Sequence, residues 1–171
     1  MKVLICDDDA LFSQKIYNNV KEIIDSFEQE ADYTVITNSP ALDVFDEKFD
    51  MAFLDIEMPC RTGLEIARHL KNINSNIVIF IITAFDYYLD DAMDINVFRF
   101  LRKPVNPERL KSGIEKALKK LDTMNLSFFI KDTERTVKIT PQEILYIEIC
   151  GRGTKIITKH KHYNSSIPIE K

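Results

Sequence analysis

Short apolar runs and amphipathic segments alternate along the first 121 residues of the chain. The apolar or β-branched runs predict strands at 2–6, 32–37, 51–59, 76–84 and 96–105. The segments between them repeat apolar residues every three or four positions, which predicts helices at 11–27, 39–49, 63–73, 86–95 and 106–121. Five strand–helix units in succession predict an α/β fold with a doubly wound, five-stranded parallel sheet.

The pattern changes to a period of two in the last third of the chain, where β-branched residues become frequent. Strands are predicted at 126–132, 135–140, 144–150 and 154–163. We therefore divide the chain into an α/β domain at 1–121, a linker at 122–125 and a β-rich segment at 126–171. The last segment is close to the smallest size at which a domain folds unaided.

Composition narrows the class of protein without naming a function. The chain is 45% hydrophobic and 29% charged, as in ordinary globular proteins, and no apolar run is long enough to span a bilayer. The acids at 7–9 interrupt any signal-peptide pattern, so we expect a cytoplasmic protein with no membrane partner. Three cysteines, Cys6, Cys60 and Cys150, have no metal-binding spacing and are expected to be free thiols.

Three consecutive carboxylates, Asp7, Asp8 and Asp9, directly follow the first apolar run. One interpretation is structural, because an Asp often caps the helix that follows a strand and acids are favourable at a helix N-terminus. The other is a cation site, because carboxylates this close repel one another unless a positive charge lies among them. This stretch alone leaves both interpretations open.

Other polar side chains stand at the ends of the remaining predicted strands, and parallel strands bring their carboxyl ends to one edge. The third strand ends near Asp55 and Glu57, the fourth at Thr83 and the fifth at Lys103. Mg²⁺ prefers oxygen ligands and is often bound by one or two acids together with a phosphate. A hydroxyl and an ammonium group beside it would neutralise the other phosphoryl oxygens. The edge therefore predicts a magnesium and phosphoryl site.

The motifs "ICDDDALF", "LDIEMPCRTGLE", "IITA" and "FLRKPV" together resemble the receiver domain of bacterial two-component response regulators, over residues 1–121. The resemblance implies a flavodoxin-like fold with strand order 2-1-3-4-5 and a cis Lys103–Pro104 bond. It implies a phosphoacceptor switch rather than a turnover enzyme, phosphorylated by a sensor histidine kinase. The implied roles are Mg²⁺ binding by Asp7, Asp8, Asp55 and the Glu57 carbonyl, phosphoryl acceptance by Asp55, phosphoryl binding by the Lys103 ammonium, and switching by Thr83 and the aromatic Phe100.

The β-rich segment is similar to the first half of a LytTR-type DNA-binding domain, through "ITPQEILYIEICGRGTKIITKHKHY". This implies control of transcription on duplex promoter DNA by a longer protein, and weak DNA binding by 171 residues alone. We also expect phosphorylation to promote a homodimer. The run "KHKH" at 159–162, read as a strand with His160 and His162 on one face, is open to three interpretations: a solvated strand, a DNA contact or a metal tract.

Two other functions remain as alternatives. A haloacid dehalogenase-type phosphatase would use Asp7, Asp9, Thr83 and Lys103, but that family needs an acid pair after its lysine and none follows Lys103. It would also leave Asp55 without a role. The second alternative is a receiver that acts only through protein contacts, which the β-rich segment argues against.

Overall fold

The computed structural model describes residues 1–37, 46–59, 61–126, 128–132, 135–151 and 153–165. The chain divides into two compact units, Met1–Leu118 and Lys119–Lys171. Within the described residues, no helix has the length and apolar character needed to cross a bilayer.

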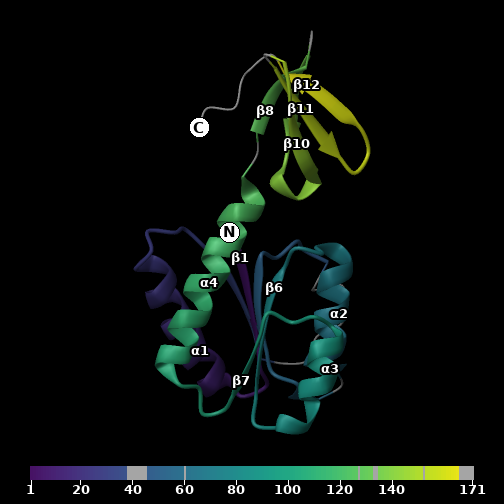
Figure 1. Ribbon diagram of the computed structural model, residues 1–171. Coiled ribbons are helices and arrows are strands. Elements are labelled where there is room, and N and C mark those ends of the chain that lie inside the picture. Colours follow the sequence, from purple (N-terminus) through teal and green to yellow (C-terminus); the bar gives the residue numbers. More distant parts are fainter. Residues whose placement is uncertain (38–45, 60, 127, 133–134, 152, 166–171) are drawn as a thin grey trace. The chain divides into compact units, whose positions relative to one another are not determined.

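The first unit is built on a parallel sheet of five strands (Figure 1). The strands are β1 (Lys2–Cys6), β2 (Asp32–Ile36), β3 (Met51–Leu54), β6 (Val78–Thr83) and β7 (Arg99–Arg102). Their order is β2-β1-β3-β6-β7, and every neighbouring pair is parallel. Counted along the chain, this is the order 2-1-3-4-5 that the sequence led us to expect, and the fold class is confirmed.

Helices cover both faces of this sheet. Helices α1 (Ala10–Asp25) and α4 (Pro107–Asn125) lie on one face, and α2 (Gly63–Ile73) and α3 (Leu89–Asp94) on the other (Figure 1). Every residue of β3 and β6 is buried, which explains why both sequences are continuously apolar. The Phe53 and Phe80 rings stack across these strands with centroids 4.7 Å apart. This rigid centre holds the strand ends in place.

Several local elements differ from the sequence-based expectation. Residues 39–45 of the helix expected at 39–49 lie outside the described residues, and 46–49 are not helical. The helix expected at 11–27 begins one residue earlier as α1, and its apolar residue Leu11 is 85% exposed. A short antiparallel ribbon of β4 (Glu57–Met58) and β5 (Arg61–Thr62), joined after β3, was not predicted. Helix α4 continues through residues 122–125, where a linker was expected. The division of the chain into domains at 1–121 and 126–171 remains a prediction.

The second unit contains an antiparallel sheet in the order β10-β11-β12-β8-β9. Its strands are β8 (Phe128–Asp132), β9 (Arg135–Ile139), β10 (Ile144–Cys150), β11 (Gly153–Thr158) and β12 (His162–Ser165). A small core packs one face, formed by Ile130, Ile139, Ile156 and Tyr163. Strand β10 lies at an edge of this sheet and exposes several large apolar side chains, Leu145, Tyr146, Ile147 and Ile149.

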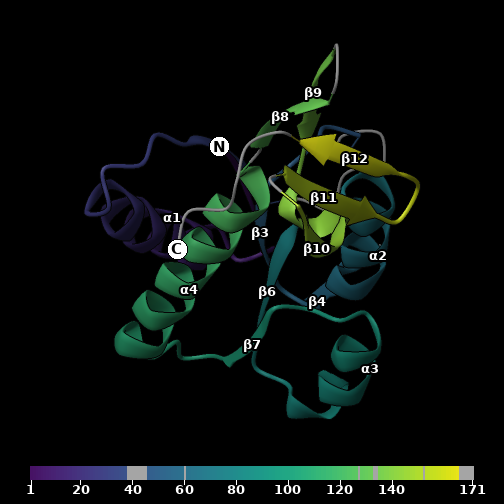
Figure 2. The same ribbon diagram turned by 45° about the horizontal axis from the view of Figure 1, so that its top comes forward.

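The single strand expected at 154–163 is wrong, because a turn divides it into β11 and β12 (Figure 2). The Thr158 hydroxyl donates to the Lys161 carbonyl at 2.7 Å and accepts from the Lys161 amide at 3.2 Å. These hydrogen bonds let a threonine form the turn without glycine or proline. His160 lies in the turn and His162 in β12, so the two do not share a strand face.

Candidate functional site

Three carboxylates meet where β1 and β3 end. Asp7 directly follows β1 and Asp55 directly follows β3, and the Asp55 amide donates to the Cys6 carbonyl at 2.9 Å. Asp7 and Asp55 are buried, whereas Asp8 is exposed. One carboxylate oxygen from each of the three lies within 4.8 Å of the others. The sheet therefore gathers the acids that the sequence predicted to converge.

Lys103, the first residue after β7, joins two of these carboxylates. Its Nζ lies 2.6 Å from Asp7 Oδ2 and 2.7 Å from Asp55 Oδ2. The same ammonium lies 4.2 Å from the centroid of the Phe12 ring, a cation–π contact that sequence patterns did not reveal. The Lys103 amide donates to the Thr83 carbonyl at 2.8 Å, and the Lys103–Pro104 peptide bond is cis, as expected.

Burial and hydrogen bonding have opposite effects on the pKa of Asp7, and also on the pKa of Lys103. Burial raises the pKa of Asp7, although the hydrogen bonds from Lys103 and from the Asp9 amide oppose the rise. Burial alone would lower the pKa of Lys103, but its hydrogen bonds to Asp55 and Asp7 outweigh burial and leave that pKa raised. The ammonium is therefore the cation that balances the buried acids.

Asp9 has a different local role from Asp7 and Asp8. Its carboxylate caps α1 by accepting from the Leu11 amide at 2.9 Å and the Phe12 amide at 3.0 Å. The structural interpretation of the acidic run thus holds for Asp9, whereas Asp7 and Asp8 join the carboxylate group.

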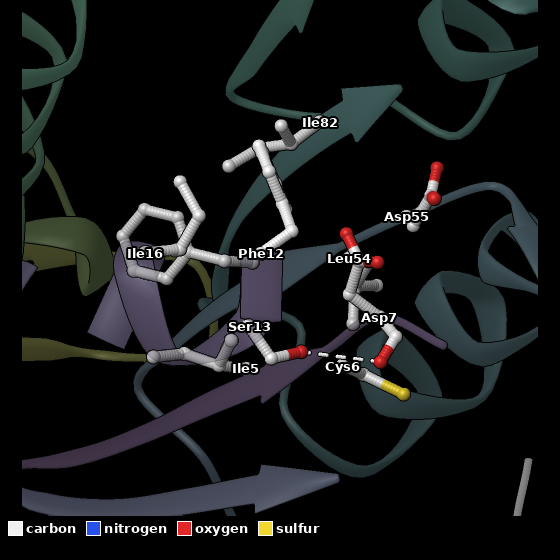
Figure 3. A pocket seen from close by; sticks show the side chains of 10 residues that line it. Ile5, Cys6, Asp7, Phe12, Ser13, Ile16, Leu54, Asp55 and Ile82 are labelled. Carbon is white, nitrogen blue, oxygen red and sulfur yellow. Dashed lines mark hydrogen bonds between the residues drawn. The ribbon is translucent and has the colours of Figure 1, made fainter. Parts of the chain in front are cut away.

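A buried serine supports Asp7 from α1. The Ser13 hydroxyl donates to the backbone oxygen of Asp7 at 3.1 Å, as Figure 3 shows. A narrow cavity of about 10 Å³ lies beside this contact, lined by residues that include Asp7, Ser13 and Asp55 (Figure 3). That space holds about one water molecule. A lone serine on an otherwise apolar helix face was the sequence signal for this residue.

The remaining predicted site residues lie around this centre. Thr83, the last residue of β6, is fully buried, and its hydroxyl oxygen accepts from the Phe85 amide at 3.4 Å. Phe100, in the middle of β7, packs against the main apolar cluster of the unit. The Glu57 side chain points to the segment after β6, where the Tyr87 and Tyr88 hydroxyls donate to its Oε1 at 2.5 and 3.4 Å. The bond to Glu57 raises the pKa of Tyr87.

Gly63, the first residue of α2, lies against the backbone carbonyl of Asp55. A Cβ atom at Gly63 would stand 1.8 Å from the Asp55 carbonyl oxygen. The helix start is fixed there by a capping box between Thr62 and Glu65, and the Gly63 amide donates to the Ile56 carbonyl at 2.9 Å. The position of the Asp55 backbone therefore depends on a residue without a side chain.

A half-buried lysine thus joins two buried acids at one edge of a five-stranded parallel sheet. The chain belongs to the response regulator receiver domain family, whose model matches residues 3–115. Receiver domains of this family are in general switches rather than enzymes.

Known relatives extend the likeness beyond the first unit. The transcriptional regulatory protein NatR of Bacillus subtilis is 30% identical over 111 residues, which is 64% of this chain and 48% of NatR. The sensory transduction protein LytR of Staphylococcus haemolyticus is 24% identical over 199 residues, covering 99% of this chain and 75% of LytR. The chain spans about half the length of the first relatives it matches. The expected resemblance to response regulators of the LytTR type is confirmed, since the relatives include LytT and LytR proteins.

Solved structures agree with the fold of the first unit. A response regulator receiver domain protein from Clostridium thermocellum is 26% identical, with a TM-score of 0.59, and covers 71% of this chain and 96% of its own. The response regulator TrrA from Thermotoga maritima, solved in complex with Mg²⁺ and beryllofluoride, is 24% identical with a TM-score of 0.56. It covers 68% of this chain and 97% of its own.

Proposed function

We propose that the protein is a cytoplasmic response regulator whose Asp55 accepts a phosphoryl group from a histidine of a sensor kinase. The observation that carries the proposal is the Lys103 ammonium held between Asp55 and Asp7 at 2.7 and 2.6 Å. An ammonium in that position can bind the oxygens of a phosphoryl group attached to Asp55.

The acids fit a magnesium ion by their chemistry. Asp7, Asp8 and Asp55 offer carboxylate oxygens within 4.8 Å of one another, which is the ligand type that Mg²⁺ prefers. We assign these three residues and the Glu57 backbone carbonyl as the groups that would hold it. A bound Mg²⁺ would neutralise phosphoryl oxygens and so lower the cost of bringing the donor to three acids. TrrA, solved with Mg²⁺ and beryllofluoride, supports this assignment by analogy.

The transfer step uses groups of this chain. A carboxylate oxygen of Asp55 attacks phosphorus, the P–N bond of the donor phosphohistidine breaks, and the imidazole nitrogen keeps the electron pair and takes up a proton. Lys103 remains positive and holds the transferred group. The Thr83 hydroxyl would then turn toward a phosphoryl oxygen, and Phe100 would move inward to fill the space. This change at β6 and β7 is the output of the switch.

A second function rests on the second unit. We propose that a protein containing this unit controls transcription by binding duplex promoter DNA, as a homodimer favoured by phosphorylation. Support comes from the relative NatR, a transcriptional regulatory protein, and from the exposed basic turn between β11 and β12. Lys159 and Lys161 of this turn could contact phosphates, which gives salt-dependent attraction.

Phosphoryl uptake from acetyl phosphate tests the first proposal. We expect intact-mass measurement to detect one added phosphoryl group with Mg²⁺ present, and none in EDTA or in Asp55→Asn. Asp91→Asn, which removes an exposed acid of α3, is the matched control and should be labelled normally. Labelling of Asp55→Asn, or labelling in EDTA, would contradict the mechanism. Continuous release of phosphate from many organic phosphates would instead support the dehalogenase-type alternative.

A further inference from the structure

The Lys103 ammonium has an aromatic partner in addition to its two carboxylate partners. Its Nζ lies over the Phe12 ring, 4.2 Å from the centroid, while it contacts Asp7 and Asp55 at 2.6 and 2.7 Å. The negative face of an aromatic ring attracts a cation at this distance, and the attraction is stronger where water is excluded. The Lys103 side chain is only 19% exposed. The ring is therefore a third group that fixes the position of the ammonium.

Phe12 is itself held in place by the start of α1. It lies in the first turn of that helix, where its amide donates to the capping carboxylate of Asp9 at 3.0 Å. Its half-buried side chain lines the narrow cavity beside Asp7 (Figure 3). The next residue, Ser13, donates its hydroxyl to the backbone oxygen of Asp7 at 3.1 Å. Two consecutive residues of α1 thus hold the two sides of one ion pair, since Ser13 binds Asp7 and Phe12 contacts Lys103.

The carboxylate partners of Lys103 are also residues that we assign to Mg²⁺. Asp7 and Asp55 contact the ammonium, and both belong to the group of carboxylates within 4.8 Å of one another. A carboxylate that binds a divalent cation attracts an ammonium less strongly, and the two cations repel each other. An aromatic ring does not take part in this competition, because Mg²⁺ takes oxygen ligands. The contact with Phe12 is therefore the one that the metal leaves unchanged.

We propose that Phe12 is a positioning residue for phosphoryl transfer, whose ring keeps the Lys103 ammonium beside Asp55 while the acids bind Mg²⁺. The inference rests on the proposed function. With acetyl phosphate as donor, an Asp55 carboxylate oxygen bonds to phosphorus, the P–O bond to the acetyl group breaks, and acetate leaves with the electron pair. Lys103 neutralises the phosphoryl oxygens in this step. Phe12 acts only through Lys103, whose flexible side chain would otherwise occupy several positions.

Fluorinated phenylalanines at position 12 test the role of the ring, because they keep its shape and remove the negative charge of its face. We expect pentafluorophenylalanine to slow phosphoryl uptake from acetyl phosphate roughly three- to tenfold at a fixed Mg²⁺ concentration, the factor that corresponds to one cation–π contact. 4-Fluorophenylalanine should give an intermediate rate. Intact-mass time courses measure these rates. Pentafluorophenylalanine in place of Phe27, an exposed residue beyond α1, is the matched control and should leave the rate unchanged.

Proton NMR of the lysine side chains measures the contact without phosphoryl chemistry. A proton over an aromatic face resonates upfield, so the Cε protons of Lys103 should lie upfield of those of exposed lysines. Their signal is assigned by its absence from Lys103→Arg. We expect it to stay upfield when Mg²⁺ is added, to move to the ordinary lysine position in Phe12→Leu, and to keep its position in Phe27→Leu.

The possible failures are distinguishable. Equal uptake rates with phenylalanine and pentafluorophenylalanine at position 12 would overturn the role of Phe12 and leave the proposed function intact. An ordinary position of the Lys103 protons in the Mg²⁺-loaded parent chain would do the same. Absence of phosphoryl uptake by the parent chain would overturn the proposed function and, with it, the positioning role of Phe12.

Discussion

Replacing Lys103 with Met removes the only cation that contacts the buried carboxylates within the described residues. The Lys103 side chain is 19% exposed, and those of its partners Asp7 and Asp55 are 5% and 9% exposed. Because both acids are shielded from water, the loss of their partner leaves negative charge that solvent cannot neutralise. We therefore expect Lys103→Met to destabilise the first unit when no metal is present.

Two estimates limit the destabilisation expected for Lys103→Met. Breaking a buried ion pair by removing one partner costs about 3–5 kcal/mol. The variant can avoid part of this cost by protonating one carboxyl group. At pH 7 that requires about 4 kcal/mol, from roughly 3 pH units above an ordinary Asp pKa at about 1.4 kcal/mol each. The expected loss at pH 7 is therefore about 3–4 kcal/mol.

The penalty should decrease as the pH falls. The pKa of Asp7 is already raised by burial in the parent chain, and loss of Lys103 removes a group that opposes the rise. A carboxyl group with a raised pKa in the folded state destabilises that state increasingly as pH rises above the pKa of the unfolded chain. At pH 5 protonation costs only about 1.5 kcal/mol, so the penalty should not exceed that value.

Urea unfolding in EDTA, monitored by circular dichroism, measures the loss of stability at pH 7 and at pH 5. Lys116→Met, at an exposed position of α4, controls for the change of side chain and should unfold like the parent. Addition of Mg²⁺ should stabilise Lys103→Met more than the parent, because Asp7 and Asp55 no longer share a lysine. A penalty below about 1 kcal/mol at pH 7, or one that does not decrease toward pH 5, would refute the argument that Lys103 balances buried charge.

Four further outcomes follow from features described above. In Gly63→Ala the new Cβ would lie 1.8 Å from the Asp55 carbonyl oxygen, so the backbone must shift to relieve the clash. We expect about 3 kcal/mol of destabilisation in urea and slower phosphoryl uptake, and parent-like stability and uptake would contradict this. Iodoacetamide should modify exposed Cys150 in the native protein but not Cys6, whose pKa burial raises to about 12. Peptide mass mapping identifies the modified cysteine, and modification of native Cys6 would contradict this prediction. Beryllofluoride should shift the chain from monomer toward dimer in light scattering, and an unchanged mass at high concentration would oppose the proposed dimer. In gel shifts with competitor DNA at physiological salt, the 171 residues should bind duplex DNA weakly; tight, competitor-resistant binding would show that the recognition surface lies within them.

The predictable parts of the fold were those set by local sequence. Strands β3 and β6 are buried on both faces, so their continuous apolar runs have one simple interpretation. The turn at 159–161 escaped prediction because it contains neither glycine nor proline, and its hydrogen bonds come from the preceding Thr158. Helix α4 passed its expected end because nothing in 122–125 breaks a helix.

The candidate site was predictable to the extent that parallel strands end at one edge. That rule placed Asp7, Asp55 and Lys103 together before any distance was known. It does not predict contacts made by side chains of helices and loops, such as those of Phe12 with Lys103 and of Tyr87 with Glu57. Those contacts depend on the paths of segments between the strands, which periodicity does not specify.

The exposed apolar side chains of β10 affect how the stability measurements should be made. Leu145, Ile147 and Ile149 are 58%, 46% and 74% exposed in the folded chain. Fluorescent dyes such as ANS respond to exposed apolar surface, so they should bind this strand before any unfolding begins. A dye-based melting curve of this protein would therefore start from a bright native baseline, and a substitution on β10 could dim that baseline without altering the stability of the fold.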